Sequence, residues 1–172
     1  MRTALTAFVL AVGLVLPPLP ASAQDTGASR QQIEQLIERF RTAIADKDTA
    51  GFMQLFLRED ITWNVVYTDD SVKRYNANLK DANIPLATRV QGGSPRKFID
   101  SIARSKQARS ETISNVRIDT DGEIAQVWFD FAFMTGDYKN AWGKESWQLV
   151  RTDAGWKIAA VVWSAEENPV PR

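Results

Sequence analysis

The last third of the chain contains three amphipathic runs in which apolar and polar residues alternate. They cover residues 123–134, 141–151 and 156–164, and they hold five of the six tryptophans. A short turn, residues 152–155, joins the last two runs, which is typical of an antiparallel hairpin. Three consecutive strands with this much aromatic volume predict a curved antiparallel meander that wraps around a core.

The residues before these runs contain signals for three helices. Ser29 is the predicted N-cap of a first helix that runs to about Ala45, with apolar residues at helical spacing. A second helix is predicted over residues 49–57. The third begins at Pro95, directly after the N-cap Ser94.

Two further strands are predicted, over residues 61–67 and 112–119. Between the first of them and the third helix lies a polar stretch, residues 68–93, which is either functional or holds a small helix near residues 75–81. The predicted fold is therefore α+β: a cone-shaped, curved, antiparallel-dominated sheet packed against three N-terminal helices.

The N-terminus has the three-part layout of a secretory signal peptide. A positive start at Arg2 is followed by an apolar run, residues 4–16, and by Ala21-Ser22-Ala23, whose small side chains suit cleavage after Ala23. The apolar run is too short for a membrane span. We therefore expect a periplasmic or secreted protein without stable membrane association. The expected organisation is a signal peptide 1–23, a spacer 24–30, a single domain 31–165 and a C-terminal tail 166–172.

The composition excludes several kinds of chemistry. The chain has no cysteine and no histidine, so it lacks a thiolate nucleophile, an imidazole base, a serine–histidine–aspartate triad and an ordinary zinc site. Its 21 basic and 21 acidic residues balance, which gives no electrostatic reason to expect binding to nucleic acid. We expect no metal and no cofactor.

Side-chain alternation along the strands predicts which residues enter the cone. Trp128 and Trp163 fall on the opposite, outward rows, where they are expected to form the interface of a homodimer. The predicted inward sets are Trp63, Val65 and Tyr67; Phe129 and Phe131; Ala141, Gly143, Glu145, Trp147 and Leu149; and Trp156, Ile158, Ala160 and Val162.

Glu145 is the one acidic residue in an otherwise largely apolar inward set. Burial against aromatic rings raises the pKa of a carboxyl group toward neutrality, which suits it to proton transfer. Gly143 is expected to leave space beside Glu145, and Trp147 to provide an apolar wall. In the alternative interpretation Glu145 lies at the open rim of the cone, solvated or paired with Arg151 or Lys144.

Four short motifs resemble a known superfamily. They are Asp46-Lys47-Asp48, Glu59-Asp60-Ile61, Trp147-Gln148-Leu149-Val150-Arg151 and Gly155-Trp156-Lys157-Ile158. Over residues 31–165 the chain resembles the nuclear-transport-factor-2-like superfamily and, within it, the SnoaL-like exported proteins of unknown function. The resemblance implies a fold that hosts isomerases, dehydratases, cyclases and members without activity. Such sequences often carry a histidine in the segment that corresponds to residues 140–143, and this chain has none there.

Three functions are open at this point. The first is the binding of a small apolar or aromatic molecule by Trp63, Phe129, Phe131 and Trp147, with Glu145 or Tyr67 fixing its orientation. The second, implied by the resemblance, is an isomerase, dehydratase or cyclase with Glu145 as general base and Tyr67 as oxyanion donor. The third is a non-catalytic protein-interaction domain whose cone is filled by its own side chains. We favour binding, because the inward set offers one carboxylate, one phenol and no imidazole.

Overall fold

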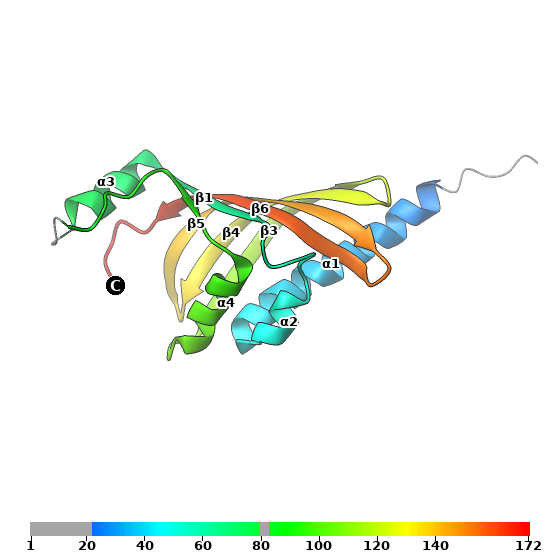
Figure 1. The fold of residues 1–172 in the computed structure, drawn as a ribbon, viewed down its shortest axis with the longest axis horizontal. Coiled ribbons are helices and arrows are strands. Elements are labelled where there is room, and N and C mark those ends of the chain that lie inside the picture. Colours follow the sequence, from blue (N-terminus) through cyan, green and yellow to red (C-terminus); the bar gives the residue numbers. More distant parts are fainter. Residues whose placement is uncertain (1–21, 80–82) are drawn as a thin grey trace, which may run out of the picture.

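A long helix and two shorter ones cover one face of a curved sheet in the computed structural model, which describes residues 22–79 and 83–172 (Figure 1). These helices are α1, α2 and α4, while α3 lies at one end of the sheet. The residues predicted as the main part of the signal peptide, 1–21, lie outside the described residues. The helices are α1 (Ser22–Asp46), α2 (Thr49–Met53), α3 (Asp69–Ala77) and α4 (Pro95–Arg104). The strands are β1 (Thr62–Tyr67), β2 (Val90–Gly92), β3 (Arg109–Thr120), β4 (Ile124–Thr135), β5 (Tyr138–Thr152) and β6 (Gly155–Glu167).

The six strands form one sheet in the order β2-β1-β6-β5-β4-β3. The last four strands are a continuous antiparallel meander, and β1 adds to β6 in parallel. The short β2, which the sequence did not predict, pairs with β1 at the edge. The α+β class and the antiparallel-dominated sheet under N-terminal helices are confirmed.

The first helix is longer than predicted. It begins at Ser22, so the predicted spacer is helical, and Ser29 is a buried residue inside the helix. The N-cap prediction at Ser29 is wrong, because the helix runs through this position. The small side chain of Ser29 lies in the same buried stripe of the helix as Ile33 and Leu36. The helix ends at Asp46, because the next residue, Lys47, has a φ of 59° and leaves the helical region.

The starts of the other helices follow their capping residues. The Ser94 hydroxyl accepts a hydrogen bond from the Lys97 amide at 3.2 Å, as its place before Pro95 predicted. Thr68 caps α3 in the same way, and α3 therefore lies earlier than the helix expected near residues 75–81. The second helix is shorter than predicted and ends at Met53.

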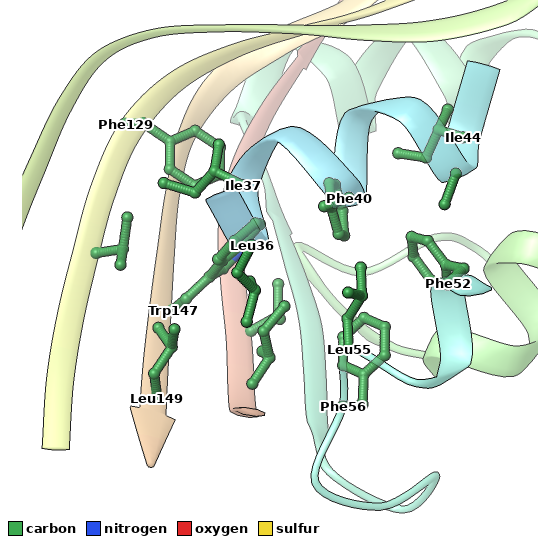
Figure 2. Packing of buried hydrophobic residues seen from close by; sticks show 14 of the residues in the cluster. Leu36, Ile37, Phe40, Ile44, Phe52, Leu55, Phe56, Phe129, Trp147 and Leu149 are labelled. Carbon is green, nitrogen blue, oxygen red and sulfur yellow. The ribbon is translucent and has the colours of Figure 1, made fainter. Parts of the chain in front are cut away.

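The core lies between α1, α2 and the inner face of the sheet (Figure 2). Trp147 of β5 is fully buried at its centre, with ring centroids 4.8 Å from Phe40 of α1 and 5.0 Å from Phe129 of β4. Figure 2 shows Leu36, Ile37 and Phe40 of α1 directed at these sheet residues. Large aromatic side chains at this contact supply much of the apolar area that folding removes from water.

One bulge in β6 corrects the predicted inward set of that strand. Leu149 pairs with Ile158 but Gln148 pairs with Ala160, so Ala159 is an extra residue. Beyond it the alternation is shifted by one: Val161, Trp163 and Ala165 face inward, and Val162 is 39% exposed. The prediction that Ala160 and Val162 point inward and Trp163 outward is therefore wrong.

Candidate functional site

A cavity of about 210 Å³ opens between the inner face of the sheet and the helices α1 and α4. Every strand except β2 contributes to its wall, so the site is built on the rigid part of the fold. The residues that line it are Phe40, Trp63, Tyr67, Phe98, Glu111, Phe131, Phe133, Asn140, Ala141, Glu145, Trp163, Ala165 and Glu167.

Glu145 is buried in this cavity, as strand alternation predicted. The pairing of β5 with β6 is in register from Ala141 to Gln148, and this keeps Glu145 on the same face as Trp147. The indole Nε1 of Trp147 donates a hydrogen bond to Glu145 Oε1 at 2.5 Å. Burial raises the pKa of Glu145 to about 7, although the Trp147 hydrogen bond favours the ionised form and opposes this rise. The carboxyl group can therefore gain or lose a proton near neutral pH.

Glu111 is a second buried carboxyl group in the same wall, and the sequence analysis missed it. It lies on β3 opposite Phe133, and its Oε1 has no hydrogen-bond partner among the described residues. Burial, followed by the negative charge of Glu145, raises the pKa of Glu111 well above the ordinary range, and Arg41 opposes this rise. Two carboxyl groups that face one apolar cavity cannot both ionise freely, so their proton occupancies depend on each other.

Aromatic rings form most of the remaining wall. Trp63 of β1 has its ring centroid 5.3 Å from Trp163 of β6 and 5.5 Å from Phe98 of α4. Phe98 in turn lies 5.8 Å from Phe133 of β4. The predicted outward position of Trp163 had removed it from the candidate site, and the β6 bulge brings it in.

Tyr67 lies at the boundary between this cavity and a second one of about 390 Å³, which residues of α3 and of the segment 85–91 line. Burial raises the pKa of Tyr67, and the neighbouring Glu167 charge and Tyr75 add to this. Its hydroxyl therefore stays protonated at neutral pH and can donate a hydrogen bond. Glu167 also lines both cavities.

The structure brings four of the predicted site residues together around one cavity: Trp63, Tyr67, Phe131 and Glu145. Phe129 and Trp147, predicted as ligand-binding residues, lie instead fully buried in the core and do not line the cavity. Trp147 reaches the site only through its hydrogen bond to Glu145.

The space expected beside Gly143 is filled. A Cβ atom at position 143 would collide with the carbonyl group of Ser164 on β6, so the glycine serves a close backbone approach. The rim position of Glu145 is also excluded, because Glu145 is only 5% exposed and Lys144 pairs with Asp130 instead.

In the part of the chain that the structure describes, no three residues among acidic, histidine and cysteine side chains gather closely enough to hold a metal ion. Within residues 22–79 and 83–172, no helix is both long enough and apolar enough to cross a bilayer.

Comparison with known proteins supports the fold. No protein-family model matches the chain, and no curated protein gives a significant match. Among solved structures, a protein of unknown function from Mycobacterium tuberculosis has a TM-score of 0.60 at 17% identity, with 91% of this chain and 80% of the other covered. An NTF2-like protein of unknown function from Pseudomonas putida has a TM-score of 0.57 at 16% identity, with coverage of 84% and 90%. A nuclear transport factor 2-like superfamily protein from Salmonella enterica has a TM-score of 0.57 at 16% identity, with coverage of 84% and 96%. The chain therefore has the nuclear-transport-factor-2-like fold.

Proposed function

We propose that the protein binds a small, flat, largely apolar molecule in the 210 Å³ cavity. The observation that carries this proposal is a cavity with aromatic walls and two buried carboxyl groups, Glu111 and Glu145, in its lining. Binding sites for small molecules commonly combine such walls with a few convergent polar groups. A domain whose cone was filled by its own side chains would lack this space.

The chemistry of the lining indicates how a ligand would be held. Trp63, Trp163 and Phe98 offer ring faces and edges for an aromatic ligand. Glu145 and Tyr67 are the groups that would fix its orientation, because each can exchange hydrogen bonds with a polar substituent. The size of the cavity favours a ligand with one ring over one with several.

The test is to fill the cavity without touching its polar groups. Ala141 lines the cavity, so Ala141→Phe should weaken the binding of single-ring fragments about tenfold or more, measured by ligand-observed NMR and calorimetry. Ala160→Phe is the matched control, since Ala160 pairs with Gln148 and faces away from the cavity. Equal fragment affinities in the wild type and in Ala141→Phe would rule out binding in this cavity.

An enzyme that moves protons is the second candidate, and the pKa of Glu145 near 7 favours it. In this case Glu145 is the general base and Tyr67 the donor to a developing oxyanion. Turnover of an enolisable single-ring ketone should then follow a pH profile with an inflection near 7. Glu145→Gln should abolish turnover while the affinity for the ketone changes little. Turnover that survives this substitution would exclude the role.

We also propose that the protein is exported, on the basis of the three-part N-terminal segment. Cleavage after Ala23 would remove only two residues of α1, and the buried stripe of the helix would stay intact. Mass spectrometry of the mature protein tests this, and a mature form that retains Met1 would contradict it.

A further inference from the structure

Among the described residues, three acidic side chains and no basic one line the candidate cavity. They are Glu111, Glu145 and Glu167, of which Glu167 also lines the neighbouring cavity. Glu145 has one partner, the Trp147 indole, whereas Glu111 Oε1 has none among those residues. A buried carboxyl oxygen without a partner is costly, so the site is missing a hydrogen-bond donor.

The nearest basic side chains are engaged elsewhere. Arg41 of α1 forms an ion pair with Glu38 at 2.9 Å, and its Nε donates only to the backbone carbonyl of Glu111, at 3.4 Å. Arg109 of β3 donates to the Thr135 hydroxyl, and its guanidinium lies 5.9 Å from the centre of the Phe133 ring. The described residues therefore place positive charge around the site but supply none inside it.

The walls of the cavity favour a cation as well. Trp63, Trp163 and Phe98 line the space with aromatic rings, and an ammonium group near the face of such a ring gains cation–π attraction that grows when water is excluded. Carboxylates add charge-assisted hydrogen bonds, which are about twice as strong as neutral ones. Aromatic rings combined with acidic groups are a receptor for an organic cation.

We propose that the ligand of this cavity is a small arylalkyl amine, with the amino group on an alkyl carbon next to the ring, bound as its ammonium ion between Glu111 and Glu145. The inference rests on the proposed binding function and specifies the chemical class of its ligand. The ammonium group supplies the donor that Glu111 Oε1 lacks, and the ring of the amine fills the aromatic part of the cavity.

Proton release is the expected signature of such binding. Burial raises the pKa values of Glu111 and Glu145, so both hold protons to higher pH than ordinary glutamates. An ammonium ion needs the ionised forms, and its binding must expel protons wherever the carboxyl groups are protonated. Arg41 opposes the rise in the pKa of Glu111, and the charge of Glu167 raises the pKa of Tyr67 rather than that of the pair. Affinity for the amine should therefore rise between pH 6 and pH 8, by up to about tenfold per pH unit for each proton released.

The experiment compares benzylamine with benzyl alcohol, which has nearly the same shape but no charge. Calorimetry at pH 8 should give an affinity for benzylamine about tenfold or more above that for the alcohol. At pH 6.5, titrations in phosphate and in imidazole buffer should differ in heat for benzylamine, because released protons are taken up by buffers of different ionisation enthalpy. The alcohol should show no such difference.

Substitutions assign the effect to the buried pair. Glu111→Gln should weaken benzylamine binding about tenfold and reduce its proton release, while binding of benzyl alcohol stays within about twofold. Glu34→Gln, on the exposed face of α1, makes the same chemical change away from the cavity and should have no effect. A thermal melt of each variant shows whether it is folded.

The outcomes separate the two proposals. If benzyl alcohol binds as tightly as benzylamine, or if Glu111→Gln leaves the preference unchanged, the amine inference is wrong and the binding function stands. If Ala141→Phe abolishes binding of neutral fragments only, the amine inference is also wrong. If neither compound binds to the folded protein at millimolar concentration, both proposals fail.

Discussion

Two glutamates inside an apolar core make the stability of this protein depend on pH. The pKa of Glu145 is about 7 in the folded protein against an ordinary value of 4.5, so the folded state holds its proton more tightly than the unfolded state does. The free energy of unfolding must therefore fall as pH rises from about 4.5 to about 7. This direction is opposite to that of a carboxylate in an ion pair, whose pKa is lowered by folding.

Glu145→Gln should remove this penalty. The amide oxygen can still accept the Trp147 hydrogen bond, and a neutral side chain costs less to bury than a carboxylate. At pH 8 the free energy of unfolding of the variant should be roughly 3 kcal/mol higher than that of the wild type, because a shift of one pKa unit corresponds to about 1.4 kcal/mol. At pH 4.5 the two proteins should be nearly equal.

Urea unfolding at the two pH values measures this difference. The exposed substitution Glu34→Gln serves as the control and should show no pH-dependent gain. If Glu145→Gln were less stable than the wild type at pH 8, the carboxylate would have to be stabilised in the folded protein by an interaction other than the Trp147 hydrogen bond.

The sequence could predict one of the two buried carboxyl groups. Glu145 belongs to a strand whose alternation is unbroken over eight residues, so its direction follows from the phase of Trp147 and Leu149. Glu111 has little such context, because it follows a polar segment and a bulge after Ser114 interrupts β3. At Asn115 the backbone adopts φ of 54°, and no pattern in the sequence indicates that break.

At the scale of elements, the bulge in β6 decides which tryptophan belongs to the site. Residues 158–163 are all apolar, so both phases of alternation fit the sequence equally well. The parallel partner β1 resolves the choice, because Trp63 pairs with Val161 and Val65 with Trp163. Pairing between distant strands thus fixes what the local pattern leaves undecided.

The close approach of β5 and β6 at Gly143 leads to a prediction about the sheet. Gly143→Ala should destabilise the protein by about 1–3 kcal/mol, because the added Cβ atom would collide with the Ser164 carbonyl and force the two strands apart. Urea unfolding of the variant measures the loss. The shift should also disturb Lys144, whose amide donates to the Ser164 hydroxyl at 3.1 Å.

Gly27→Ala is the matched control for this substitution. Gly27 lies on an exposed part of α1 with no atom within 4 Å of its added Cβ, so alanine there should leave stability unchanged or raise it by up to about 1 kcal/mol. If Gly143→Ala were as stable as Gly27→Ala, the backbones of β5 and β6 would have to be further apart than in this structure.

At the scale of the whole molecule, the helices leave the outer face of the sheet uncovered (Figure 1). Trp128 on β4 pairs with Ser146 on β5, which pairs with Val162 on β6, so the three form one row across that face. Trp128 is 36% exposed and Val162 is 39% exposed. The homodimer predicted from the sequence therefore needs a corrected set of residues, in which Val162 takes the place of Trp163.

The corrected row predicts what a substitution should do to assembly. We expect a dimer through this face, because exposed aromatic and aliphatic side chains in one row on a sheet are characteristic of an association surface. Trp128→Glu should convert the dimer to a monomer, since it replaces an apolar contact by a charge that association would bury. Multi-angle light scattering over a range of protein concentrations measures the mass directly. Leu86→Glu changes another exposed apolar residue away from the sheet face and should leave the dimer intact. A wild-type protein that stays monomeric at high concentration would show that the uncovered face has another role.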